Sequence, residues 1–141
     1  MSMRANATNE VGDVPNTGQH RSAIRLFVAD DHPILLSGLE SLFRSTPGYT
    51  VVGTATNGDD ALAAIVADPP DIAILDLRMP GKTGLEVAAG IFGERLRTRV
   101  ILLAAALTDD EVVEAVRLGV HGVVLKGMAT TLLLTDARRI Q

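Results

Sequence analysis

The chain has 141 residues, of which 47% are hydrophobic and 3% aromatic, and it carries a formal net charge of −4 and no cysteine. This length fits one domain, the acidic balance argues against nucleic-acid binding by this segment alone, and disulfides and thiolate metal sites are excluded. No apolar run reaches the roughly 18 residues of a membrane-spanning helix.

The N-terminal segment, residues 1–22, is rich in polar residues and poor in large apolar ones. Such a segment cannot bury enough surface to offset its chain entropy, so we predict a disordered tail. It also lacks the apolar stretch of a secretory signal. We therefore expect a cytoplasmic protein with one folded domain over residues 23–141.

The next part of the chain alternates between strand-like and helix-like patterns. Residues 24–29 predict a strand, and the following helix shows apolar residues at three- and four-residue spacing, namely Leu35, Leu36, Leu39, Leu42 and Phe43. Pro33 suits the first turn of this helix, with Asp31 or His32 near its cap. A second strand is expected over 50–54. Asn57-Gly58 then predicts a turn, and a second helix follows over about 59–67.

The alternation continues to the C-terminus. Residues 72–75, 100–103 and 122–125 predict three more strands. Thr83 with Glu86, and Thr108 with Glu111, fit capping boxes at two further helix starts. We expect the first of these helices to present Leu85, Ala88, Ala89 and Phe92 on one face. The second carries Val112, Val113 and Val116 and stops at Gly119. A last helix is expected over about 130–140.

Five strands alternating with five helices in one short domain indicate a doubly wound α/β fold with a parallel sheet and right-handed crossovers. The strands are continuous apolar runs, as expected for strands covered on both faces.

Charged residues follow three of the predicted strands: Asp30-Asp31 after the first, Asp76 after the third and Lys126 after the fifth. Parallel strands place these ends at one edge, where doubly wound folds bind ligands. Taken singly, the acids could serve as helix caps or turn formers, and the lysine could simply be solvated. The joint pattern favours a shared site.

Three adjacent carboxylates cannot all stay ionised without a cation. A hard divalent ion, most plausibly Mg²⁺, would neutralise them. One carboxylate can then attack phosphorus to give an aspartyl phosphate, with the metal and the lysine stabilising the transferring group.

These motifs resemble the receiver domains of bacterial two-component response regulators over about residues 23–128, and most closely the NarL/LuxR-type subgroup. The similarity lies in residues 28–33 (VADDHP), 76–84 (DLRMPGKTG) and 119–126 (GVHGVVLK). The resemblance implies a flavodoxin-like sheet of order 2-1-3-4-5 and a phosphohistidine on a sensor histidine kinase as phosphoryl donor.

The resemblance also implies roles for individual residues. Asp76 would be the phosphoacceptor, and Lys126 would pair with the phosphate. Asp31, Asp76 and the backbone carbonyl of Arg78 would bind Mg²⁺ directly, and Asp30 would act through a metal-bound water.

Two switch positions depart from the family pattern. Strand four usually ends in Ser or Thr, but here the residue is Ala104, and an aromatic residue usually stands at the position of Val123. A charge-assisted hydrogen bond of the missing kind contributes about 1.5–3 kcal/mol, comparable to a typical allosteric coupling energy. We therefore expect Asp76 to be phosphorylated but the response to be weak or unconventional, unless Thr108 supplies the hydroxyl.

Other readings remain open or are disfavoured. A receiver-like interaction module that works without phosphate is the main alternative. A phosphatase of the haloacid-dehalogenase type would need an acid at the position of Arg78. A flavodoxin is disfavoured because the acidic loop after the first strand would repel a phosphate. The histidines His20, His32 and His121 show no metal-ligand spacing.

The C-terminal segment carries an unusually apolar Leu132-Leu133-Leu134, consistent with a homodimer or with a neighbouring domain. In the NarL/LuxR-type subgroup a linker and a DNA-binding helix-turn-helix domain would follow. We therefore expect DNA contact only through an output domain that is absent from this chain, which is either a receiver from a longer regulator or a stand-alone one.

Overall fold

The computed structural model describes residues 23–128. The predicted tail over residues 1–22 and the predicted helix over about 130–140 lie outside the described residues. No helix within 23–128 has the length and apolar character needed to cross a bilayer.

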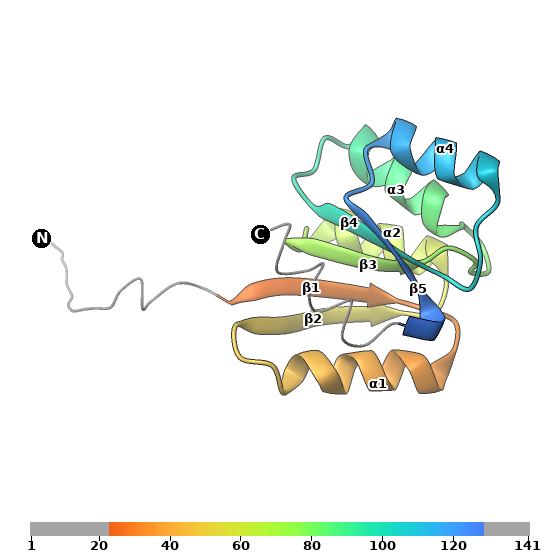
Figure 1. The fold of residues 1–141 in the computed structure, drawn as a ribbon. Helices are drawn as coiled ribbons and strands as arrows, with labels where there is room; N and C mark the ends of the chain where they lie inside the picture. The colour runs from red at the N-terminus through yellow and green to blue at the C-terminus, as the bar shows by residue number, and fades with distance from the viewer. Residues whose placement is uncertain (1–22, 129–141) are drawn as a thin grey trace, which may run out of the picture.

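Five strands form one sheet in the order β2-β1-β3-β4-β5, and every neighbouring pair is parallel (Figure 1). Their bounds are β1 Ile24–Ala29, β2 Tyr49–Ala55, β3 Ile72–Asp76, β4 Arg99–Ala104 and β5 Gly122–Leu125. The predicted doubly wound fold and its strand order are confirmed.

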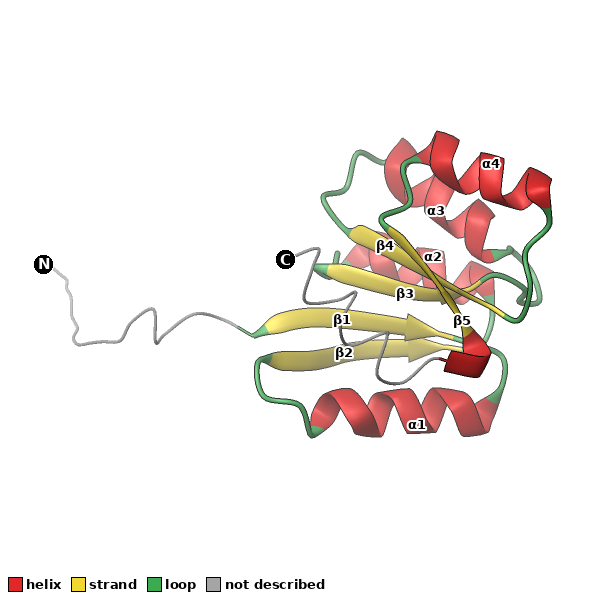
Figure 2. Cartoon of the chain, viewed as in Figure 1, coloured by secondary structure: helices red, strands yellow, loops and turns green. Residues whose placement is uncertain are grey.

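Four α-helices connect the described strands (Figure 2). They are α1 Pro33–Arg44, α2 Gly58–Ala67, α3 Gly84–Gly93 and α4 Asp109–Leu118, and a short 3₁₀ turn, η3 Lys126–Met128, follows β5. Helix α1 covers one face of the sheet, and α2, α3 and α4 lie on the other (Figure 1).

Alternating side chains of each strand enter two separate cores, because successive residues of a strand point to opposite faces. Under α1, one core contains Leu26, Val28, Ile72, Ile74, Ile101, Leu103 and Val124 together with Leu39 and Phe43. Under the other helices, the second core contains Phe27, Ala29, Ala73, Leu75, Val100, Leu102 and Ala104. This two-sided burial explains why the strands are continuous apolar runs rather than alternating ones.

Both predicted capping boxes are present. The Thr83 hydroxyl accepts from the Glu86 amide at 3.2 Å while the Glu86 carboxylate accepts from the Thr83 amide at 2.9 Å, and Thr108 and Glu111 repeat the pattern. Gly119 ends α4 at φ 87°, in the left-handed region that glycine adopts without strain.

Two local predictions were wrong or incomplete, and the structure adds the orientation of the α4 valines. Asn57-Gly58 is not a free turn, because the Asn57 side chain caps α2. Helix α3 buries Val87, Ala88 and Ile91, while Ala89 is exposed. The apolar positions of α4 face outward: Val112, Val113 and Val116 are exposed, and only Ala115 is buried on that helix.

Candidate functional site

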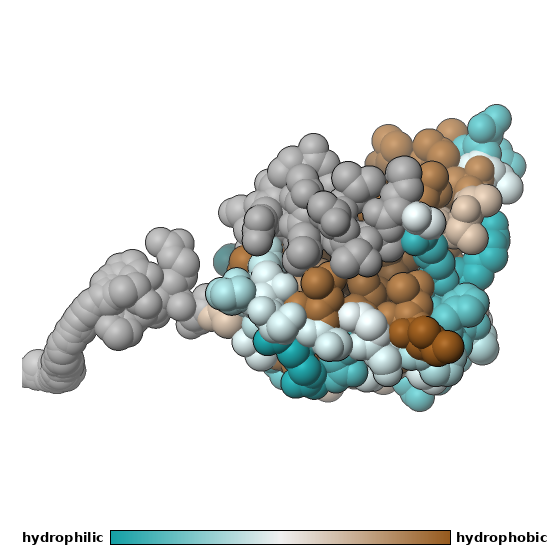
Figure 3. All heavy atoms as spheres, turned by 60° about the horizontal axis from the view of Figure 1, so that its bottom comes forward, coloured by the Kyte–Doolittle hydropathy of each residue, from teal (hydrophilic) through white to brown (hydrophobic). Residues whose placement is uncertain are grey.

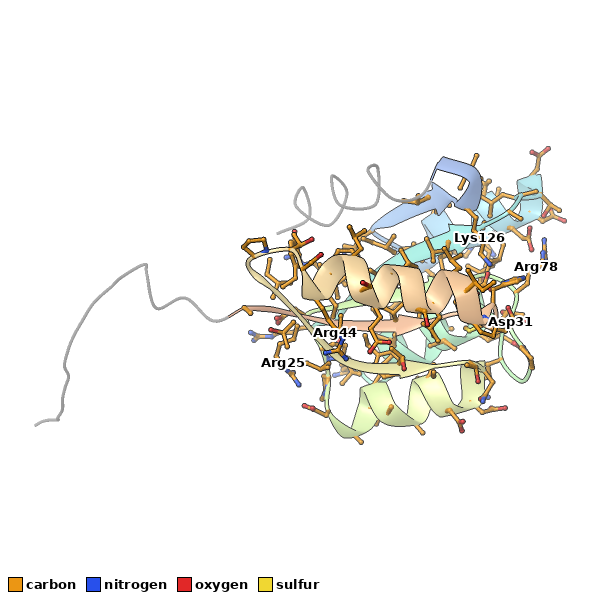
Figure 4. All side chains as sticks on the ribbon, turned by 90° about the horizontal axis from the view of Figure 1, so that it is seen from below. Arg25, Asp31, Arg44, Arg78 and Lys126 are labelled. Carbon is orange, nitrogen blue, oxygen red and sulfur yellow. The ribbon has the colours of Figure 1, made fainter. Side chains whose placement is uncertain are left out.

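The carboxyl ends of β1, β3 and β5 meet at one edge of the sheet. The register pairs Ala29 with Leu75, which places the next residues, Asp30 and Asp76, on adjacent strands. Figure 4 shows Asp31, Arg78 and Lys126 gathered at this end of the molecule, with Arg25 and Arg44 away from it. The predicted cluster of charges is therefore formed by the topology.

Lys126 bridges the two buried acids. Its Nζ lies 3.0 Å from Asp76 Oδ2 and 3.2 Å from Asp30 Oδ2. Asp30 is fully buried and Asp76 is only 2% exposed. One ammonium thus faces two carboxylates in a region of low solvation, which leaves the cluster with excess negative charge.

The excess negative charge affects the pKa values of Asp76 and Lys126. Burial raises the pKa of Asp76 above its ordinary value of 3.8; the Lys126 ammonium opposes the shift, and the negative charge of Asp30 adds to it. Burial alone would lower the pKa of Lys126, but the two carboxylates outweigh burial and raise it. The lysine therefore stays charged, while Asp76 is costly to ionise.

Three oxygens of the cluster suit a hard cation. Asp30 Oδ2, Asp31 Oδ1 and Asp76 Oδ2 are buried and accept no hydrogen bond from any residue in 23–128. The Lys126 ammonium forms ion pairs with two of them and is shared between these two oxygens. Buried oxygens without donors are the ligands that Mg²⁺ prefers, so the residues fit the implied ion.

His32 is a member of the site that sequence reasoning missed. Its Nδ1 lies 2.9 Å from Asp30 Oδ1, 3.1 Å from Asp31 Oδ1 and 3.1 Å from Lys126 Nζ. A ligand atom from each of Asp30, Asp31, His32 and Asp76 lies within 4.8 Å of the others. The position of His32 directly after two acids at a strand end was the available signal for its place in the site.

Arg78 connects the loop after β3 to α4. Its backbone amide donates to Asp76 Oδ1 at 3.3 Å, and its Nη2 lies 2.9 and 3.0 Å from the two carboxylate oxygens of Glu111. Solvent screens an exposed ion pair of this kind, so it adds little to stability. The ligand role of the Arg78 carbonyl stays a prediction.

A groove opens beside the acids on the side of α1. It is lined by His32, Ile34, Leu35, Gly38, Leu39 and Lys126. Figure 3 shows apolar atoms gathered on this face of the molecule. The rim of the site, formed by His32 and Lys126, is therefore reachable from solvent.

A comparison with known families decides what this arrangement is. The model of the response regulator receiver domain matches residues 26–138. This chain is a response-regulator receiver domain. Its relatives and structural neighbours place it with the NarL/LuxR-type regulators.

The relatives are full-length regulators. The chain is 40% identical over 103 residues to the uncharacterized transcriptional regulatory protein YvfU of Bacillus subtilis, covering 73% of this chain and 52% of that protein. It is 35% identical over 103 residues to the nitrate/nitrite response regulator NarL of Escherichia coli K12, covering 73% and 48%. The chain thus spans about half the length of the curated relatives it matches.

Among solved structures, the receiver domain of the putative response regulator NarL from Mycobacterium tuberculosis matches with a TM-score of 0.77 and 35% identity. The match covers 85% of this chain and 99% of that one.

The two positions at which the sequence is predicted to depart from the receiver pattern have definite places in the sheet. Ala104 is the buried last residue of β4, and Val123 lies one strand away in β5, 37% exposed. The hydroxyl of Thr108, the nearby candidate to replace the missing one, already accepts from the Glu111 amide as the cap of α4. In the described structure, the Thr108 hydroxyl therefore caps α4.

Proposed function

We propose that this receiver domain is a phosphorylation switch in which Asp76 accepts a phosphoryl group from a phosphohistidine of a sensor histidine kinase. A carboxylate oxygen of Asp76 attacks phosphorus, the phosphorus–nitrogen bond of the donor breaks, and the donor imidazole leaves with the electron pair. The observation that carries the proposal is the buried Asp76 carboxylate with Lys126 Nζ at 3.0 Å and two further acids beside it.

The surrounding residues would share the charge of the transferring group. Asp31, Asp76 and the backbone carbonyl of Arg78 would hold Mg²⁺, and Asp30 would act through a bound water. The ion would neutralise the carboxylates and the phosphoryl oxygens. Lys126 would pair with the phosphate. In this proposal the chain catalyses at most its own phosphorylation and dephosphorylation.

The wider role follows from the relatives. Several are described as transcriptional regulatory proteins, and the chain covers about half of each. We infer a cytoplasmic two-component regulator in which this receiver controls a DNA-binding output domain outside the chain. We also propose that the chain forms a homodimer.

Phosphorylation of Asp76 is tested by incubating the full chain with acetyl phosphate and Mg²⁺ and measuring the mass of the intact protein by mass spectrometry. We expect one phosphate per chain, lost in Asp76→Asn because the amide is not a nucleophile. Asp110→Asn, at an exposed acid in the first turn of α4, is the control and should be labelled as the wild type. A wild-type chain that takes up no phosphate, or an Asp76→Asn variant that takes up as much, would refute the proposal.

The substituted switch positions predict a muted response to phosphate. Ala104 has no hydroxyl and Val123 no ring, so phosphate at Asp76 lacks the usual contact to β4. We expect a phosphate mimic, beryllofluoride with Mg²⁺, to shift amide NMR signals near Asp76 but only weakly in β4, β5 and α4. The Ala104→Thr, Val123→Tyr double variant should show larger shifts there. Large wild-type shifts throughout α4 and β5 would contradict this idea.

A second candidate function is a receiver-like interaction module that works without phosphate. Ala104 and Val123 favour it, since they remove the contacts that would transmit a phosphorylation signal. The labelling experiment separates the two: phosphate uptake that depends on Mg²⁺ and on Asp76 favours the switch, and its absence favours the module.

A further inference from the structure

The Arg78 side chain is tied to α4, although its backbone belongs to the loop that follows Asp76. Arg78 lies two residues after Asp76, and its amide donates to Asp76 Oδ1 at 3.3 Å. Its Nη2 lies 2.9 and 3.0 Å from the two carboxylate oxygens of Glu111. Figure 4 shows Arg78 at the same end of the molecule as Asp31 and Lys126. The long side chain therefore begins beside the acceptor carboxylate and ends on another element.

The Arg78–Glu111 pair can be exchanged for a pair with another anion at little cost. The Arg78 side chain is 64% exposed, and solvent screens ion pairs of this kind. The Glu111 carboxylate also has a second partner, because it accepts from the Thr108 amide at 2.9 Å in the capping box of α4. Glu111 would thus keep a hydrogen-bond donor if the Arg78 guanidinium moved away.

Phosphorylation would create a stronger anion next to Arg78. With Mg²⁺ and Lys126 in place, the charges of the three carboxylates of the site are balanced. A phosphoryl group on Asp76 replaces one carboxylate charge with about 1.5–2 negative charges and three acceptor oxygens, so the site would lack up to one positive charge. Guanidinium groups bind phosphate oxygens through two parallel hydrogen bonds. Arg78 is a cation whose own amide already contacts the acceptor.

Helix α4 has few buried side chains to hold it, so its ion pair with Arg78 matters. Ala115 is the one residue of α4 that is buried, while the three valines of the helix are exposed. Elements with few buried apolar contacts open at low cost in free energy and are the ones that move in allostery. Loss of the pair would therefore act on the first turn of α4, where Glu111 lies.

We propose that Arg78 is a phosphate-contacting residue that Glu111 holds in reserve. Phosphorylation of Asp76 transfers the guanidinium from Glu111 to the phosphoryl oxygens and releases the first turn of α4 from the loop after β3. The inference rests on the proposed phosphorylation of Asp76 and names a route by which phosphate reaches α4 without a hydroxyl at Ala104 or a ring at Val123. The response is confined to the first turn of α4, so β4 and β5 stay largely unchanged.

Competition between phosphate and Glu111 for one guanidinium is tested with beryllofluoride, titrated in excess Mg²⁺ and followed by the amide NMR signals near Asp76. Glu111→Gln removes the competing charge but keeps the capping box, since glutamine serves at that position as well. We expect Glu111→Gln to bind beryllofluoride about fivefold more tightly than the wild type and Arg78→Ala about fivefold more weakly, at the lower end of typical coupling between sites. Arg78→Lys keeps the charge without the planar fork, so its affinity should lie between those of the wild type and Arg78→Ala.

The double variant separates transfer of the guanidinium from a general charge effect. If Glu111 acts only by holding Arg78, Glu111→Gln has no effect in the Arg78→Ala background, and the double variant should match Arg78→Ala. Glu114→Gln, which removes an equal charge from the next turn of α4, is the matched control and should bind as the wild type. In the wild type the ¹³C signal of the Glu111 carboxyl group should move on addition of beryllofluoride, and in Arg78→Ala it should stay.

Unchanged beryllofluoride affinity in Glu111→Gln, an equal gain in Glu114→Gln, or a gain that persists in the double variant would overturn the transfer of Arg78. A Glu111 carboxyl signal that does not respond to beryllofluoride in the wild type would overturn it as well. These outcomes leave the phosphoacceptor role of Asp76 standing. If the wild type bound no beryllofluoride, or if Asp76→Asn bound it equally, the proposed function would fail together with the inference.

Discussion

Asp76 is a buried carboxylate whose ionisation is only partly compensated within the chain. Burial raises its pKa, Lys126 opposes that effect, and Asp30 adds to it. A carboxyl group whose folded-state pKa is raised binds its proton more tightly in the folded chain. Its contribution to stability is therefore present below the ordinary value of 3.8 and is lost as the pH rises through the folded-state value.

Because the pKa of Asp76 is raised in the folded chain, we predict that Asp76→Asn stabilises the fold at neutral pH in buffer without divalent ions. The free energy of unfolding, measured by urea denaturation, should be higher for the variant, and the difference should disappear below about pH 3.8. Asp110→Asn should behave as the wild type, and a divalent ion should reduce the difference by stabilising the wild type. A variant that is less stable at neutral pH would show that Lys126 compensates the charge fully.

Most charged residues of the site could be predicted from the sequence. Asp30, Asp31, Asp76 and Lys126 stand at strand ends, and a parallel sheet gives those positions a common edge. His32 was missed because the direction of a side chain after a strand end depends on the turn. That turn is set by the His32 amide donating to Asp30 Oδ1 at 2.7 Å, which sequence spacing alone does not reveal.

At the scale of elements, α3 packs tightly against the strand that carries Asp76. A Cβ added at Gly84 would lie 2.5 Å from the Asp76 backbone oxygen, a group that cannot move aside cheaply. The Gly84 amide also donates to the Leu77 carbonyl at 2.8 Å. The start of α3 is therefore part of the support for Asp76.

Gly84→Ala should destabilise the fold by about 1–3 kcal/mol through overcrowding and lower the rate of Asp76 labelling by acetyl phosphate. Gly38→Ala is the matched control, because a Cβ there meets nothing within 4 Å inside α1. It should stabilise by about 0.5–1 kcal/mol through helix propensity. Equal stabilities of the two variants in urea denaturation would contradict the proposed close packing.

The elements themselves were predictable where side chains act locally. Capping boxes and the Gly119 stop depend on neighbouring residues, so both appeared where expected. The buried face of α3 and the outward valines of α4 depend on how each helix is rotated against the sheet. That rotation is a tertiary property which short-range spacing does not determine.

At the scale of the molecule, the topology assembles the site from parts of the chain far apart in sequence. The order β2-β1-β3-β4-β5 puts β1 beside β3, and therefore Asp30 beside Asp76. Because each strand is buried on both faces, its register is held by two cores at once. The fold class and strand order followed from the alternation of patterns and the resemblance.

A crystal structure of the chain with Mg²⁺ and beryllofluoride tests most directly whether the charges at the ends of β1, β3 and β5 act as one phosphoryl site. We expect beryllium bonded to a carboxylate oxygen of Asp76, a fluorine in contact with Lys126 Nζ, and a cation held by Asp31 and Asp76. An unmodified Asp76 at saturating beryllofluoride, or a cation bound away from these acids, would contradict this expectation.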